Sequence, residues 1–229
     1  MIADWHTYAI EDFIPFTTET YVRLMERQNE ALWPWHALTF MVAVAILVLL
    51  AKAHGRWAGV LCGGIWGWVG YAFHMERYSS LNWAADYFGW AFIVQGLLLA
   101  VCGLCGGLRV TRYAWPEWLG SVLAVFGLLF YPLLVALTGR GWTGSEWVAI
   151  APDPTVIFTF GIILLAVRGW WLCPLLIVPI IWCGISGATL WALETSPGLL
   201  PPMLALLALT GAVGRGFSKG RASLSENMS

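Results

Sequence analysis

The chain has 229 residues, of which 59% are hydrophobic and only 11% charged, and 16 are tryptophan. Soluble domains are usually about a quarter charged, so this composition predicts a protein embedded in a lipid bilayer. The net charge of −1 argues against a nucleic-acid partner. We expect one compact all-α membrane domain, a polytopic bundle with residues 35–216 as its body.

Residues 1–34 precede the first apolar run and lack the basic start and apolar core of a cleavable signal peptide. Within them, residues 17–33 alternate between an apolar and a charged stripe at helical spacing, and Thr17 is suited to be the N-cap. Such an amphipathic helix lies on the outer face of the bilayer or caps the open end of the bundle. We favour the cap, because the polar stripe has mixed charge and no lysine, whereas a helix that binds anionic lipid is usually basic.

Seven apolar runs follow, and they predict about seven transmembrane helices. The first, second, third, fourth and sixth approach the roughly 20 residues that cross a bilayer. The fifth and seventh are shorter and begin near prolines. Because a helix of 13 residues covers only about 20 Å, the turn Ala151–Thr155 is expected at membrane depth, buried in protein. The runs are residues 35–53, 57–74, 87–108, 118–137, 155–167, 170–192 and 199–213.

The basic residues indicate the orientation of these helices. With the N-terminus outside and the C-terminus inside, eight Lys and Arg residues fall on the inner side and four on the outer side. This distribution agrees with the positive-inside rule. Removing one short span would place the basic C-terminal tail outside, so seven spans fit better than six. The polar tail, residues 217–229, is expected to be disordered.

Small residues on the second and third runs predict that these two helices pack together. Gly59, Gly63, Gly67 and Gly70 fall on one helical face that ends on His74. On the third run, glycine and alanine repeat with similar spacing. A face of glycines lets a neighbouring helix approach closely in lipid. His74 should therefore face a protein neighbour.

Polar residues close to His74 form a first candidate site. Asp86 lies directly before the third run, and an eleven-residue connection could bring its carboxylate within hydrogen-bonding distance of the imidazole. Such a pair sets the tautomer and basicity of a histidine in metal or proton-handling sites. In the alternative interpretation, His74 satisfies a buried polar end and Asp86 caps the third helix.

A metal site is a further candidate, formed by His36, His74 and Asp86, which all lie on the predicted outer side. Two histidines and a carboxylate suit zinc, copper or iron. A haem between His36 and His74 is an alternative. No pair of ligands has a diagnostic spacing such as His-x-x-x-His, so the cofactor is not identified. The five cysteines are interpreted as apolar packing.

Several segments resemble the DUF6064 family, a group of bacterial multi-span proteins of unassigned activity. The matching pieces include residues 13–21, 26–34, His74 followed by residues 81–85, residues 131–132, 151–161 and 179–184. Leu81 and Trp83 depart from the family pattern, which has Ile and Pro at these places. The resemblance implies a location in the bacterial inner membrane. It also implies that Asn29, His74, Asn82 and the turn Ala151–Thr155 belong to one working unit.

These observations favour a protein that binds, and in one version transports, a small molecule or ion through an outward-facing polar pocket. A chain of this size could transport as a homo-oligomer. Two alternatives stay open: an accessory subunit of a larger membrane redox or light-harvesting complex, and an intramembrane metal-dependent enzyme. A retinal protein is excluded, because neither Lys52 nor Lys219 lies in a span. The candidate ligand-binding residues are Asn29, His74, Glu76, Asn82, Asp86, Asp153 and Thr155.

Overall fold

The computed structural model describes residues 14–110, 114–195 and 198–226, and this part of the chain is helical with no named strand. Each of the seven apolar runs forms a helix. The helices are α1 (Thr18–Ala31), α2 (His36–Ala51), α3 (Gly55–Val69) with η3 (Gly70–Met75), η4 (Tyr78–Ser80), α4 (Ala85–Leu104), α5 (Trp115–Val125) with η5 (Phe126–Phe130), α6 (Tyr131–Val135) and η6 (Ala136–Arg140), α7 (Pro152–Ala166), η7 (Gly169–Trp171), α8 (Leu172–Ala192) and α9 (Leu200–Glu226).

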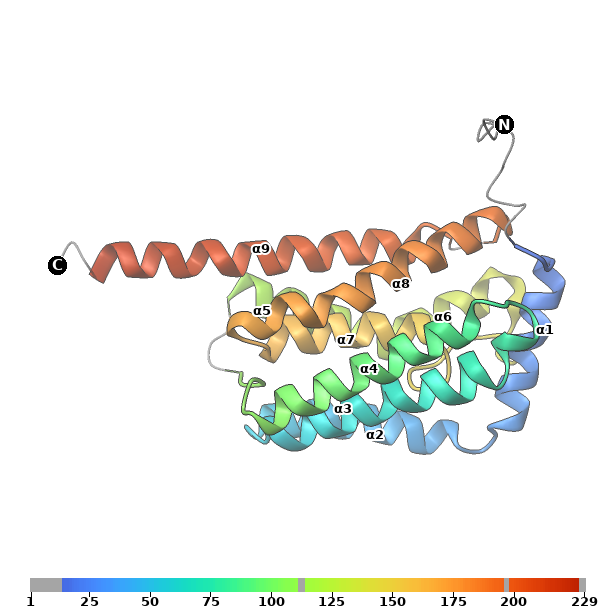
Figure 1. The fold of residues 1–229 in the computed structure, drawn as a ribbon, viewed down its shortest axis with the longest axis horizontal. Helices are drawn as coiled ribbons and strands as arrows, with labels where there is room; N and C mark the ends of the chain where they lie inside the picture. Colours follow the sequence, from blue (N-terminus) through green and yellow to red (C-terminus); the bar gives the residue numbers. More distant parts are fainter. Residues whose placement is uncertain (1–13, 111–113, 196–197, 227–229) are drawn as a thin grey trace, which may run out of the picture.

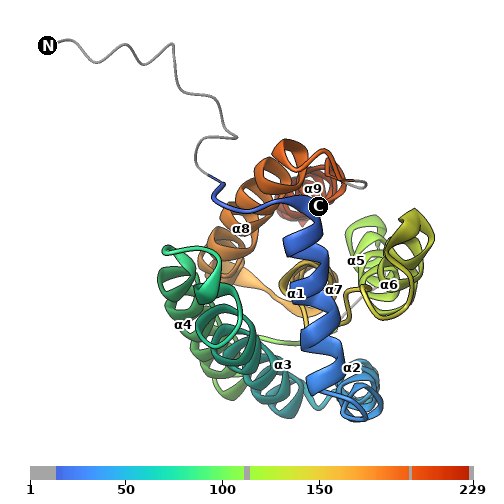
Figure 2. The same ribbon diagram turned by 90° about the vertical axis from the view of Figure 1, so that its right-hand side faces the viewer.

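Helix α7 is the centre of the bundle. Viewed along the bundle, it lies inside a ring formed by the other long helices (Figure 2). Every residue from Pro152 to Ala166 is buried. A helix that is apolar on all sides can only be stable when neighbours cover its whole circumference, and the sequence PDPTVIFTFGIILLA has this character. The predicted burial of the turn Ala151–Thr155 is therefore confirmed.

Helix α1 lies across one end of the bundle, roughly at right angles to the other helices (Figure 1). It bends by 87° from α2. The hydroxyl of Thr17 accepts a hydrogen bond from the backbone N–H of Thr20, which confirms the predicted N-cap. Five side chains of α1 are buried, and they are Tyr21, Leu24, Met25, Gln28 and Asn29. The amphipathic helix thus covers the end of the bundle.

Helices α3 and α4 pack through their glycines, as predicted. A Cβ atom on Gly59 would lie 2.7 Å from the Cα of Gly103, and one on Gly70 would lie 2.7 Å from the carbonyl oxygen of Gly89. No side chain fits at such distances, so glycine permits the close approach. Gly67 differs from the prediction, because a Cβ there would meet no atom within 4 Å.

Three helices are long and apolar enough to cross a membrane: residues 85–104, 115–140 and 169–192. The number becomes four if the bent pair α1 and α2 counts as one span. Helix α7 and residues 200–215 of α9 are apolar but shorter. Length and composition therefore support three to four spans, and the shorter apolar helices do not meet the same test. Helix α9 continues to Glu226, into the segment predicted to be a disordered tail.

Candidate polar site beneath helix α1

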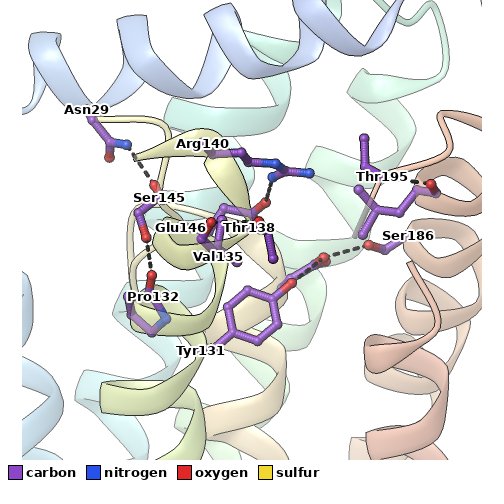
Figure 3. Close-up of polar contacts among 12 residues, drawn as sticks. Asn29, Tyr131, Pro132, Val135, Thr138, Arg140, Ser145, Glu146, Ser186 and Thr195 are labelled. Atoms are coloured by element: carbon purple, nitrogen blue, oxygen red, sulfur yellow. Dashed lines mark hydrogen bonds and ion pairs between the residues drawn. The ribbon is translucent and has the colours of Figure 1, made fainter. Parts of the chain in front are cut away.

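A cluster of polar side chains lies beneath α1, at the end of the bundle where α7 begins (Figure 3). Its members come from α1, from α6 and η6, from the segment between η6 and α7, from the start of α7, and from α8. Most of them are almost completely buried. Buried polar groups are costly unless they are hydrogen-bonded, so each partner in this cluster matters for stability.

Asn29 joins α1 to the segment that precedes α7. Its side-chain amide donates hydrogen bonds of 2.7 Å to the carbonyl oxygens of Thr143 and Ser145. Its carbonyl oxygen is 3.1 Å from Nε2 of His36, whose ring can donate to it. Every polar atom of this amide group is thus engaged. At the other end of α1, the hydroxyl of Thr18 donates to the carbonyl oxygen of Leu193.

Arg140 and Glu146 form a buried ion pair, with 2.8 Å between Nη1 and Oε1. The guanidinium also lies over the ring of Tyr21, 5.3 Å from its centroid, where a cation–π interaction is favourable. Within the described residues, Nη2 of Arg140, Oε2 of Glu146 and Nε2 of Gln28 are buried without a hydrogen-bond partner. Burial raises the pKa of Glu146, and nearby Asp153 raises it further.

Asp153, the second residue of α7, joins this helix to two neighbouring elements, α6 and α8, through its carboxylate. Its Oδ1 accepts from the indole N–H of Trp182 at 2.7 Å. Its Oδ2 accepts from the hydroxyls of Ser186 at 2.6 Å and Tyr131 at 3.1 Å. A negative charge is also favourable at a helix N-terminus. Thr155, two residues further along, accepts from the backbone N–H of Ala149 and donates to the carbonyl oxygen of Ala151.

His74 lies inside the ring of helices in an aromatic environment. The imidazole is fully buried, and its nearest ring centroids are those of Phe92 at 4.5 Å and Trp182 at 4.8 Å. Neither ring nitrogen has a hydrogen-bond partner within the described residues. The predicted hydrogen bond between His74 and Asp86 is therefore wrong. Asp86 is exposed, whereas the imidazole faces the interior.

The remaining predicted site residues lie apart from the buried cluster. Glu76 is exposed and lines a separate surface cleft. Asn82 is half-buried, donates to the hydroxyl of Tyr78 at 3.2 Å and accepts from the backbone N–H of Ala84 at 2.9 Å. These are the contacts of a turn residue. Of the seven candidate residues, the structure brings Asn29, Asp153 and Thr155 to the end of the bundle that α1 covers. The ring of Trp182 lies between His74 and Asp153.

The structure does not support the predicted metal site. No group of three or more His, Cys, Asp or Glu side chains could hold a metal ion in the part of the chain described. His36 bonds to Asn29, His74 is enclosed by aromatic rings, and Asp86 is exposed. These three positions share one end of the bundle but not one site. The same placement removes the support for a haem between the two histidines.

A second buried charge cluster lies at the opposite end of α7. Oε1 of Glu117 is 3.0 Å from Nη2 of Arg168 and 3.1 Å from Nη2 of Arg215. Nη1 of Arg215 donates to the carbonyl oxygens of Ile163 and Val167, at the C-terminal end of α7. A cation here compensates the unpaired carbonyls and the negative end of the helix dipole. The central helix therefore has an anion at its N-terminus and a cation at its C-terminus.

Arg140 and Glu146 are members of the site that the sequence does not identify. Both lie next to a glycine-rich connection, where charged residues are normally solvated. Their spacing of six residues, either side of Gly141 and Gly144, was the available signal. Contact with α1, which is distant in sequence, contributes to this burial, because the ring of Tyr21 lies against the guanidinium of Arg140.

Residues 18–223 match the family model DUF6064, which is described as a family of unknown function. This chain belongs to the DUF6064 family. The match begins at the first residue of α1 and therefore includes the whole polar cluster. No curated protein and no solved structure matches the chain. The DUF6064 assignment confirms the resemblance inferred from the sequence, and it carries no activity with it.

Proposed function

We propose that this DUF6064 protein is a seven-span protein of the bacterial inner membrane that binds a small polar molecule or ion beneath α1. In this topology the N-terminus is outside, the C-terminus is inside, and α1 is a lid on the outer end of the bundle. The distribution of basic residues supports this orientation. The many large apolar side chains exposed around the bundle, such as Leu97 and Leu206, suit contact with lipid.

The observation that carries the binding proposal is the incomplete hydrogen bonding of the Arg140–Glu146 pair. An uncompensated buried polar atom costs about 1–3 kcal/mol, and two such atoms belong to charged groups. Arg140 offers a donor and Glu146 offers an acceptor at the same buried place. A small solute with both a donor and an acceptor, or an ion with its water, would complete these hydrogen bonds.

Helix α1 gives this site a route to solvent. It is joined to the bundle near its ends by Thr18 and Asn29, and a short bend connects it to α2. Release of the Asn29 hydrogen bonds would uncover the segment that carries Glu146. Binding would then favour the closed position of α1, as in other proteins with a closing lid. Transport across the membrane, by a homo-oligomer of this chain, is an extension of this proposal.

Thermal unfolding of the detergent-purified chain tests the proposal. Glycine, acetamide, sodium chloride and ammonium chloride are the probes, because they represent zwitterions, neutral amides and ions. We expect at least one probe to raise the Tm of the wild type and not that of Glu146→Gln or Arg140→Gln. The control is Arg56→Gln, since Arg56 is exposed at the start of α3, away from α1. Absence of any probe-specific shift in the wild type, or an equal shift in all variants, contradicts the proposal.

An accessory role in a larger membrane complex is the second candidate. It is favoured by exposed aromatic side chains at the start of α4: Trp83 is 81%, Tyr87 70% and Trp90 63% exposed. Such a patch suits either a partner helix or the membrane interface. Purification in mild detergent distinguishes them, because a partner would co-purify in a fixed ratio that Trp83→Ala and Trp90→Ala abolish.

A further inference from the structure

A surface cleft of about 430 Å³ lies between α1 and the segment that follows η3. It is separate from the buried polar cluster. Three arginines line it: Arg23 and Arg27 from α1, and Arg77 from the turn after η3. Helix α1 and the turn after η3, which are distant in sequence, thus both contribute arginines to the lining of this cleft.

The charges in this cleft are not balanced. None of the three arginines forms an ion pair within the described residues, although the chain has other ion pairs. Glu76 is the only acid among the described residues that line the cleft, so the lining has two net positive charges. The whole chain has a net charge of −1 and only 12 Lys and Arg residues. A quarter of its basic side chains therefore lines one cleft.

We propose that this cleft binds a phosphate group. Guanidinium groups form paired, charge-assisted hydrogen bonds with phosphate oxygens, and several guanidiniums can share one tetrahedral anion. Thr20 and Ser80 also line the cleft, so the rest of its lining is partly polar. The phosphate belongs either to a free phosphate compound or to the headgroup of an anionic lipid, since α1 lies at the end of the bundle.

Phosphate binding here would also tie α1 to the bundle. An anion held by Arg23, Arg27 and Arg77 bridges α1 and the turn after η3. The bridge adds to the hydrogen bonds of Thr18 and Asn29. The anion site does not depend on the proposed solute site, because the two share no residue.

The full-length chain in neutral detergent is titrated with inorganic phosphate, and its Tm is measured. In parallel, the chain is placed in nanodiscs of phosphatidylcholine, alone or mixed with phosphatidylglycerol. The variants are Arg23→Gln, Arg27→Gln and Arg77→Gln, with Arg56→Gln as the matched control. Arg23 and Arg27 are exposed, so their replacement leaves the packing of the bundle intact even if Arg77→Gln does not fold.

We expect phosphate or phosphatidylglycerol to raise the Tm of the wild type and of Arg56→Gln. Each cleft variant should weaken the effect about tenfold in apparent affinity, as expected for a lost charge-assisted hydrogen bond. A shift with inorganic phosphate identifies a free phosphate, and a shift with phosphatidylglycerol alone identifies a lipid headgroup. Glu146→Gln should keep the shift, which separates this site from the solute site. Equal responses of the wild type and the three cleft variants in both arms would overturn the proposal.

Discussion

The side-chain amide of Asn29 donates to the carbonyl oxygen of Ser145 at 2.7 Å, across 116 residues of sequence. This bond, and its neighbour to Thr143, hold the end of α1 against the segment that leads into α7. The same segment carries Glu146. The position of α1 and the burial of the ion pair are therefore linked through one asparagine.

Replacement of Asn29 by alanine is expected to loosen α1. Two buried or half-buried carbonyl oxygens lose their donor, so we expect the free energy of unfolding to fall by about 2 kcal/mol. Hydrogen exchange of the α1 amides should increase at the same time. Glu30→Ala is the control, because Glu30 is adjacent and exposed. Equal effects of the two substitutions would show that Asn29 does not hold α1 in place.

Asp153 should be the most sensitive position of the cluster. In Asp153→Ala, the hydroxyls of Tyr131 and Ser186 and the indole N–H of Trp182 lose their acceptor together. We expect unfolding to become easier by about 3–5 kcal/mol, the cost of breaking a buried charged network. Ser186→Ala removes one of these bonds and should cost about 1–2 kcal/mol. Chemical denaturation in detergent compares the two, and a smaller effect for Asp153→Ala would contradict this account.

Substitutions of His74 test whether its buried imidazole has a role beyond packing. Phenylalanine has a similar shape and removes two nitrogens that lack partners, so His74→Phe should raise the free energy of unfolding by about 1 kcal/mol. His74→Ala leaves a cavity among the aromatic rings and should lower it by about 3 kcal/mol. If His74→Phe is as harmful as His74→Ala, the imidazole binds something that the folded chain alone does not provide.

The close contact between α3 and α4 through their glycines, the glycine seam, can be tested with a matched pair of glycine substitutions. A Cβ on Gly63 would overlap the carbonyl oxygen of Gly96, whereas one on Gly64 meets no atom within 4 Å. Gly63→Ala should therefore destabilise the chain by about 2 kcal/mol through overpacking. Gly64→Ala should stabilise it by up to about 1 kcal/mol through helix propensity. Thermal unfolding of both variants checks the expectation, and a similar response would show that the seam is not closely packed.

Some features of the structure could be predicted from the sequence. Helices and the glycine seam follow from local periodicity, because hydrophobic runs and small residues at regular spacing have one simple interpretation. The sequence could not predict which way His74 and Asp86 face, since a small rotation of each helix separates them. It could not predict the burial of Arg140 and Glu146 either, because that depends on α1, which is more than 100 residues away. Contacts between distant segments decide the polar site.

Glu146 should make the stability of the fold depend on pH. In the folded chain its pKa rises from the usual 4.5 to about 7, because burial and then Asp153 disfavour the charged form, while Arg140 opposes the shift. The folded state therefore binds a proton more tightly than the unfolded state. Stability from this group is fully present below about pH 4.5 and is lost as the pH rises towards 7.

The measurement is the Tm of the wild type and of Glu146→Gln at several pH values between 4.5 and 8. The wild type should lose stability as the pH rises through this range. Glutamine cannot titrate and resembles the protonated carboxyl group, so the variant should show a flatter dependence and should match the wild type best at the acidic end of the range. Glu30→Gln, an exposed carboxyl on α1, should follow the wild type. If the wild type and Glu146→Gln have parallel profiles, the ion pair with Arg140 keeps Glu146 charged at every pH, and the titrating group lies elsewhere.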